Sequence, residues 1–222
     1  MKKIAIIGWE EGLAGQISQW IPFKIACYIH PEDKLPKIDL KKIKKRPLKN
    51  FSYPTKGKYL KKTIICSKKW PTFLKQKKIR NVLILISDRK KRAKLIEISK
   101  KNKFRLPSMI HPSSVIIKNS KLGKGVVIEP LVFVGHKAEI EDGVYLQERA
   151  SVEHGCFIKK CSTINPGVII TGNCRIGEQS IIHTGSVIKN NVSIGKNSIV
   201  GAGSLVLKDI KENKKVFGVP AK

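Results

Sequence analysis

The chain has 222 residues, 41% of them hydrophobic, and a formal net charge of +29. This length allows one large domain or two modest ones, and no apolar run approaches the roughly 20 residues of a membrane-spanning helix. The five cysteines form no closely spaced Cys/His cluster of the zinc type. We therefore expect a cytoplasmic protein with reduced thiols, no membrane span and no bound metal.

The positive charge is concentrated in the first half of the chain. Residues 1–115 carry 30 Lys/Arg and 7 Asp/Glu, whereas residues 116–211 carry 12 and 8. Such an excess is typical of proteins that bind polyanions. Lysine far outnumbers arginine, however, and arginine is the better bidentate phosphate ligand. We therefore expect mainly a solvated lysine-rich surface without a nucleic-acid partner, and keep contact with anionic surfaces as the alternative.

Short apolar runs alternate with amphipathic segments in the first half. The expected elements are, in chain order, a strand over 3–8, a helix over 13–20, a strand over 24–29, a strand over 81–86 and a basic helix over 88–103. This alternation predicts a small α/β, Rossmann-like βαβ domain over residues 1–108. Residues 31–80 are rich in lysine and proline and show no clear pattern.

The second half has a six-residue period. From Ile116 to Lys211 the first position of all sixteen hexads is aliphatic, and the fifth is nearly always small or β-branched. A helix requires a period near 3.6 and a flat strand a period of 2, so neither explains this pattern. Three hexads can instead form one turn of a three-sided coil of parallel strands, which predicts about five turns within a domain over 109–222.

The order of motifs resembles one family of enzymes. An Ile110-His111-Pro112-Ser113 junction follows the small domain, and Gly201-Ala202-Gly203-Ser204 and Gly218-Val219-Pro220-Ala221 follow the coil. Across essentially the whole chain this resembles the NeuD/PglD-like sugar acetyltransferases of the hexapeptide-repeat superfamily. The resemblance implies a left-handed parallel β-helix, a homotrimer with sites in the clefts between subunits, and acetyl-CoA as cosubstrate. It also implies an acceptor that is a nucleotide-linked amino sugar of surface-glycan synthesis, of the 4-amino-4,6-dideoxy type.

The stretch Ala150-Ser151-Val152-Glu153-His154-Gly155-Cys156 is similar to the segment that holds the catalytic histidine in this family. An acceptor amine must lose a proton when it attacks a thioester, and imidazole can accept that proton near neutral pH. We therefore expect His154 to act as a general base in direct transfer, with Glu153 among the residues that orient it. Cys156 raises the alternative of a cysteine nucleophile, but its fifth hexad position predicts a core residue.

The family resemblance also implies the binding residues. Gly172, Thr184 and Ala202 are expected to line acetyl-CoA. Gly8, Trp9, His136 and Gln147 are expected at the acceptor.

His136 precedes His154 by three hexads, one full turn of the coil, which raises the alternative of a metal site. Such a site needs a third histidine, and His183 occupies a different hexad position, so no metal site is predicted.

Two other functions remain open. O-acetylation of a sugar hydroxyl, of the sialic-acid type, needs the same base and coil. A non-enzymatic, polyanion-binding trimer is favoured by Gly155, which stands where the family has an acidic residue. Glu10 and Glu11 in the first glycine-rich turn also favour it, because they repel phosphate.

Overall fold

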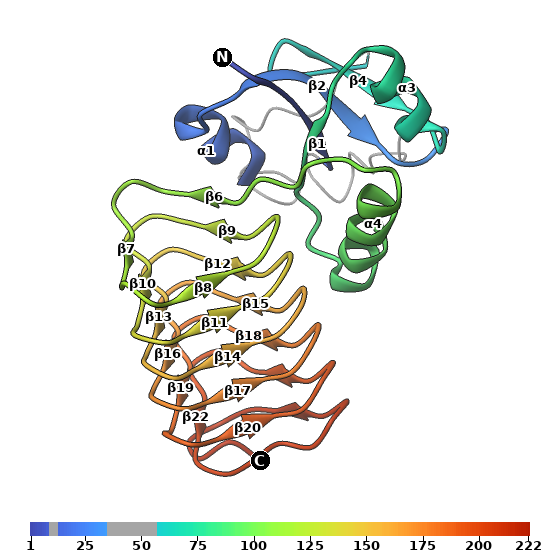
Figure 1. The fold of residues 1–222 in the computed structure, drawn as a ribbon. Helices are drawn as coiled ribbons and strands as arrows, with labels where there is room; N and C mark the ends of the chain where they lie inside the picture. The colour runs from blue at the N-terminus through green and yellow to red at the C-terminus, as the bar shows by residue number, and fades with distance from the viewer. Residues whose placement is uncertain (9–12, 35–56) are drawn as a thin grey trace, which may run out of the picture. The chain divides into compact units, whose positions relative to one another are not determined.

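The computed structural model describes residues 1–8, 13–34 and 57–222 (Figure 1). These residues form two compact units. The first contains residues 1–87 and 98–105, and the second contains residues 88–97 and 106–222. No helix in the described part of the chain is long and apolar enough to cross a membrane.

The first unit is built on a five-stranded sheet with the strand order β3-β4-β2-β1-β5. All pairs are parallel except β3 with β4, which is antiparallel. The strands are β1 (Lys3–Ile7), β2 (Lys24–His30), β3 (Lys58–Tyr59), β4 (Lys62–Cys66) and β5 (Asn81–Ile84). The helices are α1 (Leu13–Trp20), α3 (Trp70–Gln76) and α4 (Arg89–Lys101), the last of which passes from the second unit back into the first.

The sequence predicts most of this sheet. Residues 4–7 of β1 are fully buried because the strand lies between β2 and β5 and is covered on both faces. The predicted strands β1, β2 and β5 and the helices α1 and α4 are confirmed. Strands β3 and β4 and helix α3 were missed, since their short apolar runs are interrupted by lysines and by Pro71.

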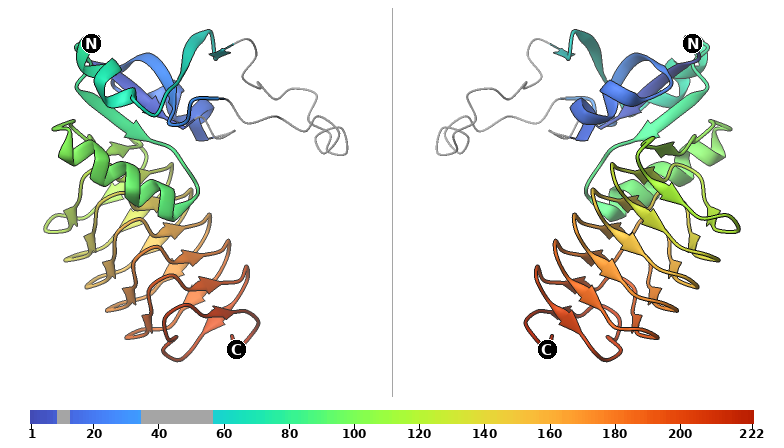
Figure 2. Two further views of the ribbon diagram at one scale, coloured as in Figure 1. Left: turned by 90° about the vertical axis from the view of Figure 1, so that its right-hand side faces the viewer. Right: turned by 90° about the vertical axis from the view of Figure 1, so that its left-hand side faces the viewer.

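The second unit contains a three-sided coil of two-residue strands (Figure 2). The first side comprises β6 (Met109–Ile110), β9 (Val127–Ile128), β12 (Tyr145–Leu146), β15 (Thr163–Ile164), β18 (Ile181–Ile182), β21 (Ile199–Val200) and β23 (Lys215–Val216). The second comprises β7 (Val115–Ile116), β10 (Phe133–Val134), β13 (Ser151–Val152), β16 (Ile169–Ile170), β19 (Val187–Ile188) and β22 (Leu205–Val206). The third comprises β8 (Lys121–Leu122), β11 (Glu139–Ile140), β14 (Phe157–Ile158), β17 (Arg175–Ile176) and β20 (Ser193–Ile194).

The register of the coil follows the predicted period. Phe133 pairs with Ser151 and Ser151 with Ile169, so each strand lies beside the strand three hexads later. The aliphatic first positions form a continuous buried core from Ile128 to Val206. The fifth-position serines from Ser162 onward are also buried. The hydroxyls of Ser162 and Ser180 are satisfied there, since they donate to the Gly177 and Gly195 carbonyls at 2.8 Å.

The last turn departs from the predicted repeat. The six-residue period places Ile210 at the fifth position of the final hexad. In the structure Ile210 instead forms a parallel bridge with Ile194, a first-position residue, although a full turn would place Glu212 opposite Ile194. Strand β23 likewise pairs with β21 as Ile199 with Lys215, again two positions short of a full turn. The final turn is therefore two residues shorter than the others, and the prediction of an unbroken repeat to Lys211 is wrong at its end.

A buried arginine fixes the first turns of α4 to the coil within the second unit. Arg92 is fully buried, and its Nη2 donates to the Cys161 carbonyl at 2.6 Å and to Thr163 Oγ1 at 2.8 Å. Its guanidinium also lies 3.7 Å from the centroid of the Tyr145 ring, in a cation–π contact. These contacts offset the desolvation of the charge and explain why residues 88–97 belong to the second unit.

Candidate functional site

His154 follows strand β13, at the corner where the second side of the coil turns into the third. We call this the His154 corner; the residues stacked in it at intervals of one turn are Lys118, His136, His154, Gly172 and Asn190. Backbone hydrogen bonds of 2.9 Å connect the turns, from Gly155 N to the His136 carbonyl and from Asn173 N to the His154 carbonyl. Both histidine side chains are exposed.

The position after His154 requires a left-handed backbone. Gly155 has φ +65°, and a Cβ there would lie 2.3 Å from Oδ1 of Asn173 in the next turn. Glycine meets both conditions without strain. A side chain at this position would have to displace the Asn173 amide.

The His154 ring lies against the buried backbone of Gly172. A Cβ built on Gly172 would lie 2.5 Å from both Cε1 and Nε2 of the ring. The missing side chain at Gly172 thus makes room for the imidazole, which lies outside the core and is exposed. His136, one turn earlier, has its Nδ1 3.3 Å from the Lys118 carbonyl.

Two neighbours of His154 have partners of their own. The Glu153 carboxylate accepts a hydrogen bond of 2.8 Å from the Ser151 hydroxyl, which holds the carboxylate along β13. Cys156 is fully buried, which confirms its assignment to the core. A hydrogen bond with Cys174 and burial raise the pKa of the Cys156 thiol, so it stays protonated and is a poor nucleophile.

The other predicted binding residues of the coil lie at a different corner, between its first and second sides. We call this the Thr184 corner; the stacked residues are Pro112, Pro130, Glu148, Pro166, Thr184 and Ala202. Thr184 and Ala202 are exposed, and Gln147 immediately precedes Glu148. One side of the coil separates this corner from the His154 corner. A single chain therefore brings Gly172 and His136 to His154, but not Gln147, Thr184 or Ala202.

Sequence reasoning did not single out Glu129, which lies one turn before Gln147. It is only 3% exposed, and its Oε1 has no hydrogen-bond partner within the described residues. Burial, followed by the hydrogen bond and charge of Glu148, raises the pKa of Glu129 to about 8. A carboxyl group that stays protonated near neutral pH gives the Thr184 corner a hydrogen-bond donor that an ionised glutamate lacks.

Gly8 and Trp9 are the two residues of the first unit that the sequence predicts to contact the acceptor. Gly8 has φ +87°, a Cβ on it would lie 2.2 Å from the Leu85 carbonyl oxygen, and its N–H donates to the Ile29 carbonyl at 2.9 Å. Packing between strand ends therefore accounts for this glycine, and its N–H is already used. Trp9 lies outside the described residues.

Comparisons with known proteins agree with the coil and with the order of the two units. The family model described as bacterial transferase hexapeptide (six repeats) matches residues 173–208. No curated protein is significantly similar to the chain in sequence.

Several solved structures are similar over the whole chain. PerB from Caulobacter crescentus, in complex with CoA and GDP-perosamine, has a TM-score of 0.84 and 23% identity over 100% of this chain and 97% of its own. The acetyltransferase domain of PglB from Neisseria gonorrhoeae, in complex with acetyl coenzyme A, has a TM-score of 0.82 and 24% identity, covering 100% and 98%. WeeI from Acinetobacter baumannii has a TM-score of 0.79 and 22% identity, covering 100% and 99%.

The chain has the fold of these proteins. The predicted architecture, a small α/β domain followed by a left-handed parallel β-helix, is confirmed. Parallel crossovers are ordinarily right-handed, so the handedness rests on the resemblance and not on the hexad period.

Proposed function

We propose that this chain is an acetyl-CoA-dependent N-acetyltransferase that acts on a nucleotide-linked amino sugar, with His154 as its general base. One observation carries the proposal: an exposed imidazole lies over a glycine at a corner of the coil, in a chain with the fold of a perosamine N-acetyltransferase. The chemistry of the site agrees, because the imidazole is accessible and the nearby thiol is not.

The proposed reaction is a direct transfer. The acceptor amine attacks the thioester carbonyl of acetyl-CoA while Nε2 or Nδ1 of His154 takes a proton from the nitrogen. The tetrahedral intermediate collapses, the C–S bond breaks, and the proton returns from the imidazole to the leaving thiolate. The products are the acetamido sugar and CoA, and no covalent enzyme intermediate forms.

The two-corner arrangement supports a homotrimer as the working form. If the Thr184 corner of one subunit faces the His154 corner of the next, then Gln147, Thr184 and Ala202 join His154 in a cleft between chains. In that cleft the exposed residues Thr184 and Ala202 would leave room for the CoA arm, and Gly172 would lie beneath the base.

The acceptor we propose is a 4-amino-4,6-dideoxy sugar linked to a nucleotide, as used in surface-glycan synthesis. The structure of PerB holds GDP-perosamine, and this chain shares its fold from end to end. The carboxyl-terminal edge of the sheet in the first unit, where Gly8 follows β1, is the proposed place for the nucleotide.

The test is acetyl transfer by the purified chain from acetyl-CoA to a panel of GDP-, UDP-, dTDP- and CMP-linked amino sugars. CoA release and product mass are measured, and hydroxylamine treatment separates an amide product from an O-acetyl ester. The variant His154→Ala is expected to lower kcat by about 100-fold or more, as is typical of a lost general base. Lys121→Ala, which removes an exposed side chain of strand β8 on the third side of the coil, is the control.

Acetylation of no panel member would contradict the proposal. An unchanged rate in His154→Ala would contradict the role of the base, and a hydroxylamine-labile product would replace N-transfer with O-transfer.

A further inference from the structure

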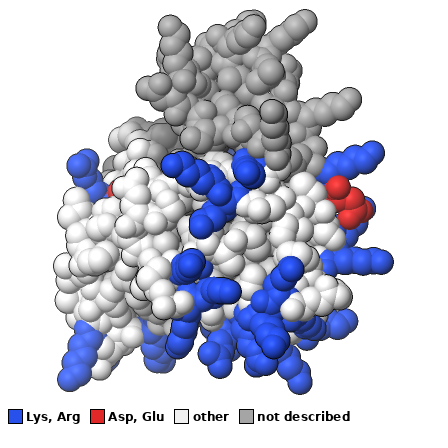
Figure 3. Space-filling view, turned by 90° about the horizontal axis from the view of Figure 1, so that it is seen from above, with Lys and Arg blue, Asp and Glu red and all other residues white. Residues whose placement is uncertain are grey.

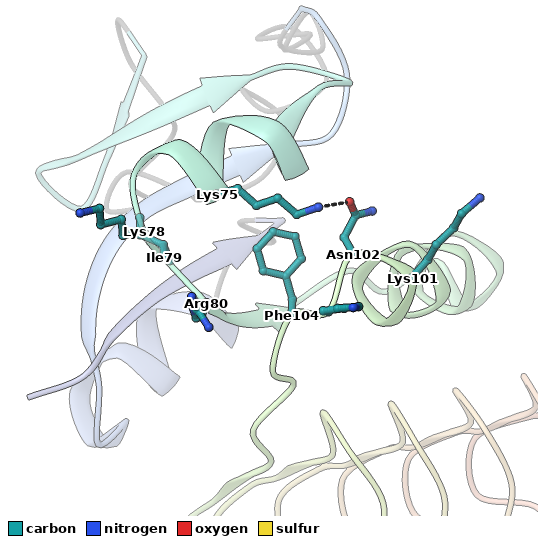
Figure 4. A pocket seen from close by; sticks show the side chains of 8 residues that line it. Lys75, Lys78, Ile79, Arg80, Lys101, Asn102 and Phe104 are labelled. Carbon is teal, nitrogen blue, oxygen red and sulfur yellow. Dashed lines mark hydrogen bonds between the residues drawn. The ribbon is translucent and has the colours of Figure 1, made fainter.

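A second candidate site lies in the first unit, whereas His154 belongs to the second. It is a cavity of about 850 Å³ between the loop from α3 to β5 and the end of α4 (Figure 4). The charged side chains around it are Lys75, Lys78, Arg80, Lys101 and Lys103. Ile79 and Phe104, which are 6% and 8% exposed, form its apolar floor.

The cavity lies at the opposite edge of the sheet from the Gly8 turn. Arg80 immediately precedes β5, whereas Gly8 follows the last residue of β1, and β1 and β5 are parallel. The cavity is therefore at the amino-terminal edge, and the turn proposed for the nucleotide is at the carboxyl-terminal edge. The two sites can be occupied independently.

The charges in the cavity are uncompensated. No acidic residue lines it, and within the described residues none of its five cations forms an ion pair. In the part of the chain that the structure describes, the five cations form one side-chain hydrogen bond, from Lys75 Nζ to Asn102 Oδ1 at 2.8 Å. Among the charged side chains visible in Figure 3, Lys and Arg are far more common than Asp and Glu. Cations gathered in a concave site raise the local concentration of anions.

Helix dipoles explain only part of this cluster. Lys75 and Lys101 lie in the last turns of α3 and α4, where a cation is stabilised by the partial negative charge of the helix end. Lys78 and Lys103 each follow the last helical residue by two positions, whereas Arg80 lies farther from the end of α3, next to β5. The helix dipoles therefore do not account for Arg80.

We propose that this cavity binds a ligand that carries a diphosphate group. The cations come from two segments, with Lys75, Lys78 and Arg80 on one and Lys101 and Lys103 on the other, and this division suits a ligand with two linked anionic groups better than one with a single group. The guanidinium of Arg80 can donate two N–H hydrogen bonds to one phosphate.

The aromatic floor argues against single-stranded nucleic acid as the ligand. Sites for single strands stack bases on exposed aromatic rings. Phe104 is buried and packs on Trp70, with ring centroids 5.6 Å apart, so it offers little face to a base. The proposal does not depend on acetyl transfer or on His154.

The test compares inorganic pyrophosphate with orthophosphate by titration calorimetry on the full chain at low salt. The informative variant is Lys78→Asn/Lys103→Asn, because both lysines have a left-handed backbone, φ +54° and +59°, which asparagine tolerates. The matched control is Lys61→Asn/Lys137→Asn, which removes the same charge from positions with φ +60° and +58° outside the cavity.

We expect pyrophosphate to bind more tightly than orthophosphate, and the cavity variant to weaken it by about tenfold while the control stays within about twofold. Vesicles that carry an isoprenyl diphosphate form a second arm; cavity-dependent binding to them identifies a lipid source, and its absence identifies a soluble one. Equal binding of the two anions, or equal loss in the cavity and control variants, would overturn the proposal.

Discussion

The imidazole of His154 rests on Gly172 of the following turn so closely that a Cβ on Gly172 would lie 2.5 Å from ring atoms Cε1 and Nε2. No side chain could be added at Gly172 without moving the proposed base. Because His154 is exposed, the ring can move outward at little cost to the core. The position of the base and the stability of the fold can therefore be separated by experiment.

Gly172→Ala is expected to lower kcat of acetyl transfer by about tenfold or more while the Tm changes little, because a displacement of about 1 Å at the reacting group is costly. Gly15→Ala is the control, since a Cβ on Gly15 meets nothing within 4 Å. Steady-state kinetics and thermal unfolding check both variants. A Gly172→Ala protein with full activity would show that the ring position in this structure is not the catalytic one.

Arg92→Ala is expected to lower the free energy of unfolding by about 3 kcal/mol. The substitution leaves a cavity and removes the hydrogen bonds that Arg92 donates to the Cys161 carbonyl and the Thr163 hydroxyl. It also removes the cation–π contact with Tyr145. Lys94→Ala, at an exposed position of the same helix, is the control and should change stability by less than about 0.5 kcal/mol. Chemical denaturation measures both, and equal effects would mean that the buried guanidinium does not fix α4 to the coil.

The coil was predictable from the sequence because its core repeats with every hexad and each side chain packs on its counterparts in the adjacent turns. Its end was not predictable, because Ile210 is aliphatic and fits either inward position of a hexad. The burial of Arg92 and Glu129 could not be predicted from the sequence. Arg92 lies in a lysine-rich helix and Glu129 at a corner of the coil, and in both places a charged side chain is expected to be exposed. The His154 motif was found through family resemblance. Its contact with Gly172 follows from the spacing of one turn, but the burial of that glycine does not.

Glu129 is expected to make the stability of the protein depend on pH. Its pKa is raised from 4.5 to about 8, so the folded state binds a proton that the unfolded state releases. The stability that the protonated Glu129 carboxyl group contributes is fully present below about pH 4.5 and is lost as the pH rises through about 8. Glu129→Gln should therefore raise the Tm relative to the wild type at about pH 9 and have little effect at about pH 4.

The exposed carboxylate variant Glu178→Gln is the control for Glu129→Gln. Thermal unfolding across this pH range measures both variants. A wild-type pH profile that is unchanged by Glu129→Gln would contradict the assignment of a protonated buried carboxyl group.

The separation of His154 from Ala202 within one chain predicts complementation between inactive variants. His154→Ala removes the base, and Ala202→Trp is expected to block the proposed CoA cleft at the Thr184 corner, so each homotrimer should be nearly inactive. Mixing the two after unfolding and refolding should restore about a quarter of the sites, because a site built from two chains is intact only where each supplies its unaltered corner. Acetyl-transfer rates of the refolded mixture, compared with those of each variant refolded alone, provide the measurement. Recovery is expected only if one cleft is shared between subunits; a mixture no more active than its parts would place the whole site within a single chain.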